Sequence, residues 1–217
     1  MGAFTGWPVD AVEFYRGLEA DNSKAYWTAH KSDYDTLVLA PMQALLDDLE
    51  AEFGPGRVFR PYRDIRFSAD KSPYKTAIGA TVGESGYVHL SASGLGVGAG
   101  CHVMAPDQLA RFRAAIDDDR SGEALVAAVA AVEDDGVPVI VHEQLKRVPR
   151  GFDPEHPRAE LLRDKDLTTW VEWPVASWLH SPDAETRVAG ALRASKPLTD
   201  WLETHVGPAT QERRPGR

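Results

Sequence analysis

The chain lacks most of the features that would assign a function from sequence alone. It has a single cysteine, Cys101, among 217 residues. This excludes an internal disulfide and a cysteine-based zinc site, and it favours a cytoplasmic location. No apolar run approaches the roughly 20 residues that span a bilayer. The N-terminal residues show no basic segment followed by an apolar core, so we expect neither a membrane segment nor a secretory signal.

Short motifs of common catalytic and nucleotide-binding sites are also missing. The sequence contains no HExxH, GxSxG or Walker-type GK[ST] motif, and its seven histidines form no HxH or HxxxH pair. The even-numbered glycines from 94 to 100 do not form a GxGxxG followed by a helix. We therefore expect no metal and no cofactor. The alternative is a metal site formed by convergence of His89, His102 and His142, which are assigned to predicted strands.

Charge is distributed unevenly along the chain. The formal net charge is −9, yet residues 57–75 carry six lysines and arginines against only two acidic residues. The segments on both sides are strongly acidic. Proteins that bind duplex nucleic acid usually present an extended basic face, so one short basic island argues against a nucleic-acid partner and favours a compact anion.

The basic island coincides with the sequence RPYRDIRFSADKSPYK from Arg60 to Lys75. Arginine gives planar two-point contacts to phosphate or carboxylate groups, lysine adds charge, and tyrosine adds a hydroxyl. We therefore predict that this block binds a small anionic metabolite. Whether the protein also catalyses a reaction of that metabolite is left open by the sequence. The candidate ligand-binding residues are Arg63, Asp64, Arg66, Asp70, Lys71, Tyr74 and Lys75, together with Arg150 from the distant segment LKRVPRGF.

An alternative interpretation of the same block is structural. Asp64 and Asp70 could pair with Arg63 and Arg66 and so pin a long loop across the sheet. The protein would then be a non-enzymatic interaction module whose acidic helices meet a basic partner. The sequence names no reaction and indicates no oligomeric state.

Periodicity predicts a single α+β domain over residues 1–206, with a mostly antiparallel sheet flanked by N-terminal and C-terminal helices. Residues 207–217 are expected to form a disordered tail. Helices are expected at 8–20, from 23 to 53 with a kink at Pro41, and at 106–118, 122–133, 160–165, 181–192 and 198–205. Strands are expected at 58–59, 65–67, 77–82, 87–92, 95–103, 137–141 and 168–173.

The strand predicted at 95–103 has an unusual composition. Gly96, Gly98 and Gly100 fall on one of its faces together with His102, whereas apolar side chains fall on the other face. A face of glycines lets a neighbour come very close. We interpret it as close packing of a helix or of the Arg60–Lys75 loop, with the floor of a ligand site as the alternative.

Several of these features occur together, and in the same order, in one known family. They are Asn22 with Tyr26-Trp27 and His30, the block RDIRFSADKSPYK from Arg63 to Lys75 including Phe67, the glycine-rich strand ending at Gly100, PRGF at 149–152 and His156-Pro157. Over about residues 4–203 the chain resembles the family known as domain of unknown function 2461. The resemblance implies no established activity. Family members often have an aromatic residue at the position of His102, so this histidine is not expected to be a general family element.

Overall fold

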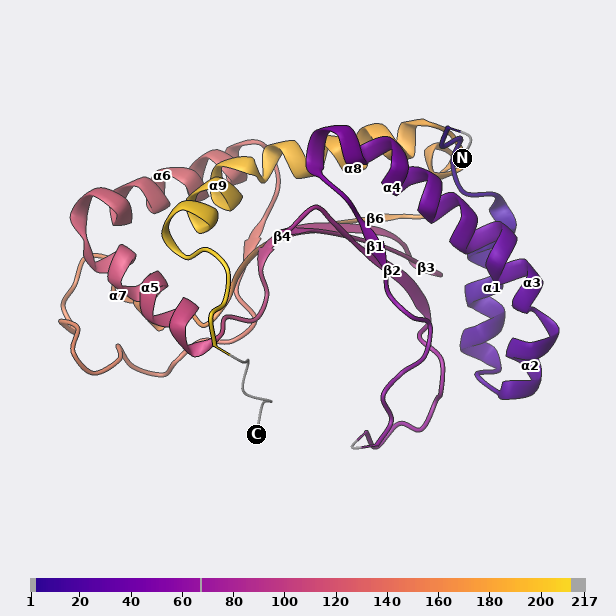
Figure 1. Ribbon diagram of the computed structural model, residues 1–217, viewed down its shortest axis with the longest axis horizontal. Coiled ribbons are helices and arrows are strands. Elements are labelled where there is room, and N and C mark those ends of the chain that lie inside the picture. Colours follow the sequence, from indigo (N-terminus) through magenta and orange to yellow (C-terminus); the bar gives the residue numbers. More distant parts are fainter. Residues whose placement is uncertain (1–2, 67, 212–217) are drawn as a thin grey trace. The chain divides into compact units, whose positions relative to one another are not determined.

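The computed structural model describes residues 3–66 and 68–211 of the chain. It is an α+β fold with an open antiparallel sheet, which confirms the predicted class (Figure 1). Along the described chain the hydrogen-bonded strand order is β1-β2-β3-β4-β6-β5. The strand bounds are β1 Arg57–Val58, β2 Ala77–Val82, β3 Gly86–Ser91, β4 Gly94–Cys101, β5 Val139–Ile140 and β6 Leu167–Pro174.

The described residues divide into two compact units. Unit 1 contains residues 3–97 and 172–190, and unit 2 contains residues 98–171 and 191–211. Strands β4 and β6 contribute residues to both units. Among the described residues, no helix combines the length and apolar character needed to cross a membrane.

Helices form the first part of unit 1. Their bounds are α1 Val9–Ala20, α2 Lys24–Ala29, α3 Lys31–Asp33, the π-helical turn η1 Tyr34–Leu39 and α4 Ala40–Phe53. The Ser23 hydroxyl caps α2 by accepting a hydrogen bond from the Tyr26 N–H at 3.1 Å. The kink predicted at Pro41 takes the form of the π-helical turn directly before α4. Proline has no N–H to donate to the carbonyl four residues earlier, so the regular helical ladder is interrupted there.

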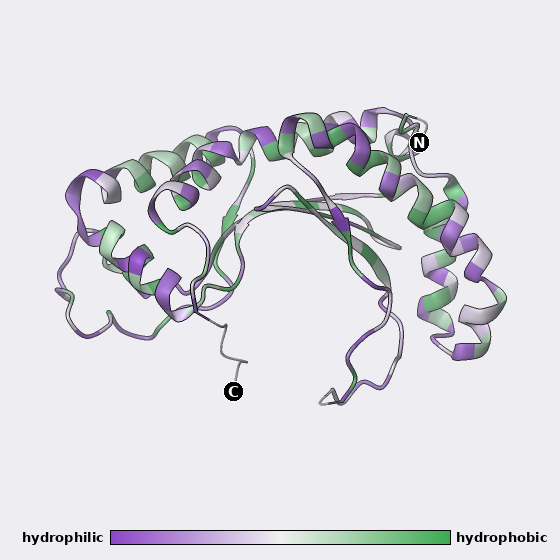
Figure 2. Cartoon of the chain, viewed as in Figure 1, coloured by the Kyte–Doolittle hydropathy of each residue, from purple (hydrophilic) through white to green (hydrophobic). Residues whose placement is uncertain are grey.

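The strands of unit 1 pack their apolar residues into the core beside these helices. β2 and β3 pair antiparallel along their whole length, from Ala77 opposite Ser91 to Val82 opposite Gly86. The loop from residue 59 to residue 76 joins β1 to β2 and extends away from the sheet as two limbs (Figure 1). Figure 2 colours much of this loop as hydrophilic, in contrast to the hydrophobic colouring of β2 beside it. The 3-10 turn η2 Ser177–His180 and most of α8 Asp183–Ala194 complete the unit.

Unit 2 is built around a separate apolar core. Its helices are α5 Pro106–Asp117, α6 Asp119–Asp134, α7 Ala159–Arg163 and α9 Lys196–His205. Asp118 caps α6 by accepting a hydrogen bond from the Ser121 N–H at 2.9 Å. Trp201 on α9 is buried against α6, and its indole N–H donates to the Ser121 carbonyl at 2.8 Å. The break predicted at Lys196-Pro197 is confirmed by the start of α9 at Lys196.

The structure bears on three further expectations from the sequence. The strand predicted at 65–67 is wrong for Ile65 and Arg66, which lie in the loop, and Phe67 lies outside the described residues. The close neighbour of the glycine-rich strand is β6, because a Cβ on Gly98 would lie 2.6 Å from the Thr169 carbonyl oxygen. In the predicted tail, Gly207 accepts a hydrogen bond from the Gln108 side chain at 2.8 Å. Residues 212–217 lie outside the described part.

Candidate functional site

The loop from Arg60 to Lys75, here called the basic loop, is an irregular hairpin in unit 1. The Arg63 N–H donates to the Pro73 carbonyl at 2.9 Å, and the Lys75 N–H donates to the Pro61 carbonyl at 2.8 Å. Tyr62 and Tyr74 form an isolated antiparallel bridge between these two bonds. The two limbs are therefore held together near the sheet by their own backbone.

The second limb is anchored to the N-terminal helices. The Tyr74 ring stacks on Trp27 with 4.4 Å between centroids and 10° between planes. The Asn22 side chain accepts a hydrogen bond from the Tyr74 N–H at 3.0 Å and donates to the Tyr74 carbonyl at 3.1 Å. Burial raises the pKa of the Tyr74 hydroxyl. These contacts give a physical reason why Asn22, Trp27 and the basic loop occur together in one sequence.

Two arginines of the basic loop, Arg63 and Arg66, are paired with its two aspartates. Arg66 binds Asp64 through two bonds, Nε to Oδ1 at 2.9 Å and Nη2 to Oδ2 at 2.6 Å, and Arg63 binds Asp70. Hydrogen bonds from Arg66 lower the pKa of Asp64 to about 2. Hydrogen bonds from Arg63 and then from Ser72 lower the pKa of Asp70. The pairs expected by the structural interpretation are thus present.

These pairs are exposed rather than buried. The Arg66 side chain is 76% exposed, and exposed pairs contribute little to stability because water and salt screen them. Lys71 points its ammonium at the Ile65 carbonyl, 3.1 Å away, within the same loop. The charged groups of Arg63, Arg66 and Lys71 therefore each bind a different partner within the loop.

Two hollows flank the base of the basic loop in unit 1, and Phe59 and Lys75 line both of them. The larger one, here called the basic hollow, has a volume of about 660 Å³. Its lining contains the cations Lys31, Arg57, Arg60 and Lys75, one carboxylate, Asp35, and the aromatic rings of Trp27, Tyr34, Phe59 and Tyr62. The other, here called the acidic hollow, has about 620 Å³ and is lined by Arg63 and Lys75 against Glu19, Asp64 and Asp70.

Three of the four cations of the basic hollow differ from Arg63 and Arg66 in forming no ion pair within the described residues. Lys31 pairs with Asp35 at 2.6 Å, but within residues 3–66 and 68–211 no carboxylate forms an ion pair with Arg57, Arg60 or Lys75. Burial, and then the charge of Arg60, lower the pKa of Lys75. Its ammonium lies 5.4 Å from the centre of the Phe59 ring, which is within the range of a cation–π contact.

The remaining sequence-predicted residue is in the other unit. Arg150 is exposed in a turn of unit 2, between β5 and α7, and belongs to the lining of neither hollow. Of the eight candidates, Arg63, Asp64, Asp70, Tyr74 and Lys75 line the acidic hollow, and Lys75 alone also lines the basic hollow. The cations Arg57 and Arg60 were not among the candidates. Their membership of the same basic island was the signal that could have included them.

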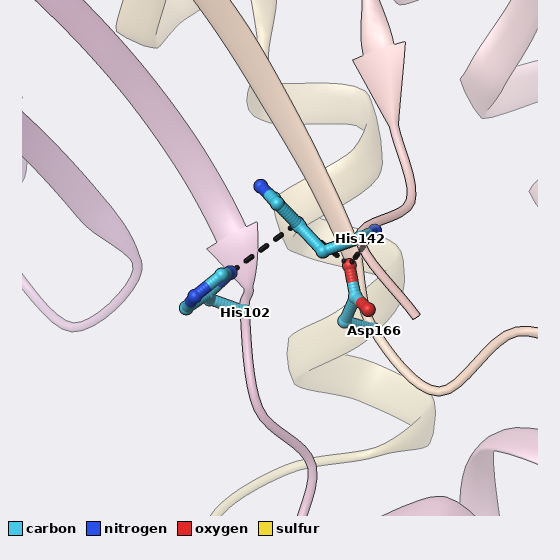
Figure 3. Close-up of side chains that lie close together, drawn as sticks. All are labelled: His102, His142 and Asp166. Atoms are coloured by element: carbon cyan, nitrogen blue, oxygen red, sulfur yellow. Dashed lines mark hydrogen bonds and ion pairs between the residues drawn. The ribbon is translucent and has the colours of Figure 1, made fainter. Parts of the chain in front are cut away.

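Unit 2 brings together a second group that the sequence analysis raised only as an alternative. His102 follows β4 directly, Asp166 directly precedes β6, and His142 lies two residues after β5 (Figure 3). β5 pairs antiparallel with β6. Gly98 lies next to Thr169 and Gly100 lies next to Leu167, so β4 also runs antiparallel to β6. The ends of β4 and β5 therefore meet the start of β6.

In this second group the ring nitrogens and the carboxylate face one another (Figure 3). The Nδ1 atoms of His102 and His142 are 3.3 Å apart, and His142 Nδ1 is 2.9 Å from Asp166 Oδ1. His89 is on β3 in unit 1 and is not a member of the group.

Together these observations define an α+β protein with an antiparallel sheet and a basic, aromatic-lined hollow. The chain belongs to the family described as conserved hypothetical protein (DUF2461), whose family profile matches residues 10–201. This confirms the resemblance drawn from the basic loop and the N-terminal motif. No curated protein and no solved structure matches the chain. The family description names no activity, so the function must be argued from the geometry of the sites.

Proposed function

We propose that the basic hollow binds a small organic anion that has an aromatic or apolar body. The observation that carries this proposal is the set of three cations, Arg57, Arg60 and Lys75, that line one hollow without a described acidic partner. Cations held close together repel one another, and a bound anion removes that repulsion. The acidic hollow offers no such excess, because its carboxylates outnumber its cations.

The lining also matches the body of such a ligand. A volume of about 660 Å³ is in the range of small-molecule sites. The exposed ring of Tyr62 provides a face for an apolar group, and the buried rings of Trp27 and Tyr34 line the same hollow behind it.

Lys75 links this proposal to the residues predicted from the sequence. Its pKa is lowered by burial and by Arg60, and an anion next to it would stabilise the charged ammonium. Arginine can make a two-point contact to a phosphate or carboxylate, which assigns Arg57 and Arg60 the orienting role. The structural interpretation then applies to the two ion pairs of the loop, which are formed by Arg63, Asp64, Arg66 and Asp70.

The test compares two arginines of the same loop that lie three residues apart. Phenyl phosphate and inorganic phosphate are titrated into the full chain by isothermal calorimetry, with wild type, Arg60→Ala and Arg63→Ala. Loss of one charge-assisted contact costs about 1.5–3 kcal/mol, so Arg60→Ala should weaken phenyl phosphate binding by about 10- to 150-fold. Arg63→Ala serves as the matched control and should change it by less than about twofold, because Arg63 already pairs with Asp70.

The comparison of the two probes tests the apolar part of the lining. Phenyl phosphate should bind more tightly than inorganic phosphate in wild type, because only the former buries a ring against the exposed Tyr62. Equal affinities of the two probes would refute the proposal that the ligand has an aromatic or apolar part. Absence of binding by both probes, or a larger loss in Arg63→Ala than in Arg60→Ala, would refute the site and favour the interaction module instead.

A further inference from the structure

In the group formed by His102, His142 and Asp166, the His142 Nδ1 atom is in contact with both of the other residues, and one hydrogen bond cannot account for both contacts. His142 Nδ1 is 2.9 Å from Asp166 Oδ1 and 3.3 Å from His102 Nδ1. An imidazole nitrogen has one in-plane position, occupied either by a proton or by a lone pair. This nitrogen can form a hydrogen bond to the carboxylate or to the other ring, but it cannot form two hydrogen bonds of good geometry at once. A cation between the three atoms would serve all of them.

We propose that His102, His142 and Asp166 bind a divalent transition-metal ion, with Zn²⁺ the best fit to the donor set. Two imidazole nitrogens and one carboxylate oxygen are ligands that Zn²⁺ accepts readily, and three protein ligands are typical of zinc sites that keep an open coordination position. This site is separate from the basic hollow, since its three residues belong to unit 2.

The spacing of the two ring nitrogens agrees with coordination of one ion. With Zn–N distances of about 2.0–2.1 Å, two ligand atoms of a tetrahedral site lie about 3.3 Å apart. The Nδ1 atoms of His102 and His142 are 3.3 Å apart, and all three ligand atoms lie within 4.8 Å of one another. The two rings are nearly perpendicular, at 85° with 4.3 Å between centroids. Binding would require His142 and Asp166 to separate by about 0.4 Å to reach the same spacing.

Asp166 supplies an independent reason to expect a cation. Its side chain is only 3% exposed, and in the described part of the chain no lysine or arginine forms an ion pair with it. A buried carboxylate without a cationic partner is costly.

The backbone holds this carboxylate in position for binding. The His142 N–H donates to Oδ1 and the Glu143 N–H donates to Oδ2, each at 2.8 Å. Such bonds from outside the coordination shell fix the orientation of a ligand group and are a usual part of metal sites. His142 is therefore tied to Asp166 by both its backbone and its ring, so the two ligands form one preassembled unit.

Access to the site is open on the side of the histidines. His102 and His142 are exposed, whereas Asp166 is buried. An ion bound there would be held from the protein side by the carboxylate and would face solvent through its remaining positions. This arrangement is suited to binding water or a substrate group at the metal, in contrast to a closed structural zinc site.

The experiment uses the full chain after chelator treatment and dialysis, with Zn²⁺ titrated by isothermal calorimetry. We expect one ion per chain in wild type, and affinity lower by about 100-fold or more in His102→Ala and in His142→Ala. Both histidine side chains are exposed, so both variants should fold, which circular dichroism verifies. His30→Ala is the matched control, because it removes a histidine of unit 1 and should leave the affinity unchanged.

A spectroscopic readout places the ion at these residues. Long-range ¹H–¹⁵N spectra of the imidazoles should show Zn²⁺ shifting the Nδ1 resonances of His102 and His142 but not the resonances of His30. Co²⁺ in place of Zn²⁺ should give visible absorption bands that are absent from the His102→Ala variant. The proposal is overturned if wild type binds no Zn²⁺. It is equally overturned if His102→Ala and His142→Ala bind with wild-type affinity.

Discussion

Replacement of Asn22 by alanine tests how the N-terminal helices hold the basic loop. The Asn22 amide makes two hydrogen bonds to the backbone of Tyr74, one as acceptor at 3.0 Å and one as donor at 3.1 Å. Tyr74 is only 5% exposed, so water does not readily replace the lost partner. Asn22→Ala removes the described partner of one part-buried N–H and one part-buried carbonyl of Tyr74 and keeps the Trp27 stacking contact in place.

The expected cost follows from those two bonds. A typical intramolecular hydrogen bond contributes about 0.5–1.5 kcal/mol, so the variant should lose about 2 kcal/mol of unfolding free energy. For a chain of this length 1 kcal/mol corresponds to about 2–4 °C in melting temperature, which gives a decrease of about 4–8 °C. If the loop limb opens separately, the same free energy should speed amide exchange at Tyr74 by about 30-fold.

Differential scanning calorimetry and amide exchange measured by NMR separate the global effect from the local one. Thr28→Ala is the matched control, since Thr28 is an exposed residue of α2 and its loss should shift the melting temperature by less than about 1 °C. The reasoning is refuted if Asn22→Ala leaves both the melting temperature and the exchange rate of the Tyr74 amide at the wild-type values.

Other predictions concern pairing, glycine and pH. Arg66→Ala should leave the urea midpoint unchanged, because its pair with Asp64 is exposed; a large decrease would show that the pair holds the loop. Gly190→Ala in α8 should raise the unfolding free energy by about 0.5–1 kcal/mol, since nothing surrounds its added Cβ. Gly100→Ala should lower it, because Gly100 has φ +118 and its Cβ would lie 2.5 Å from a carbonyl oxygen of β6. Anion affinity should fall as pH rises through the lowered pKa of Lys75, because binding favours the ammonium and takes up a proton; calorimetry in buffers of different ionisation enthalpy measures this uptake.

Helices and long strands could be predicted because their periodicity is local. The apolar spacing in α1 and the Lys196-Pro197 break each depend on residues within a few positions. The strand predicted at 65–67 is wrong for Ile65 and Arg66 for an equally local reason. The Asp64 carboxylate accepts the Arg66 N–H at 3.2 Å, and the Asp70 carboxylate accepts the Ser72 N–H at 2.9 Å. Aspartates that bond the backbone two residues ahead form turns in competition with a strand ladder.

The histidine group could not be assembled from sequence in the same way. His102, His142 and Asp166 are separated by 40 and 24 residues, and their convergence depends on the strand order β4-β6-β5. Nothing in the spacing of the histidines encodes that order. The signal that was available is positional: each of the three residues lies at the end of a strand, where side chains from neighbouring strands meet.

The proposed anion site shows why the number of cations in a segment does not by itself identify the cations available to a ligand. Residues 57–75 form one basic island in the sequence, but the acidic residues of the same island form ion pairs with some of its cations, and those cations are then less available to a ligand. Asp64 binds Arg66 two positions away, and Asp70 reaches Arg63 across the two limbs of the loop. Arg57 and Arg60 precede both aspartates, form no described ion pair and line the basic hollow. A cation in a mixed-charge segment is therefore a better ligand candidate when no acidic residue competes for it along the chain or across the hairpin.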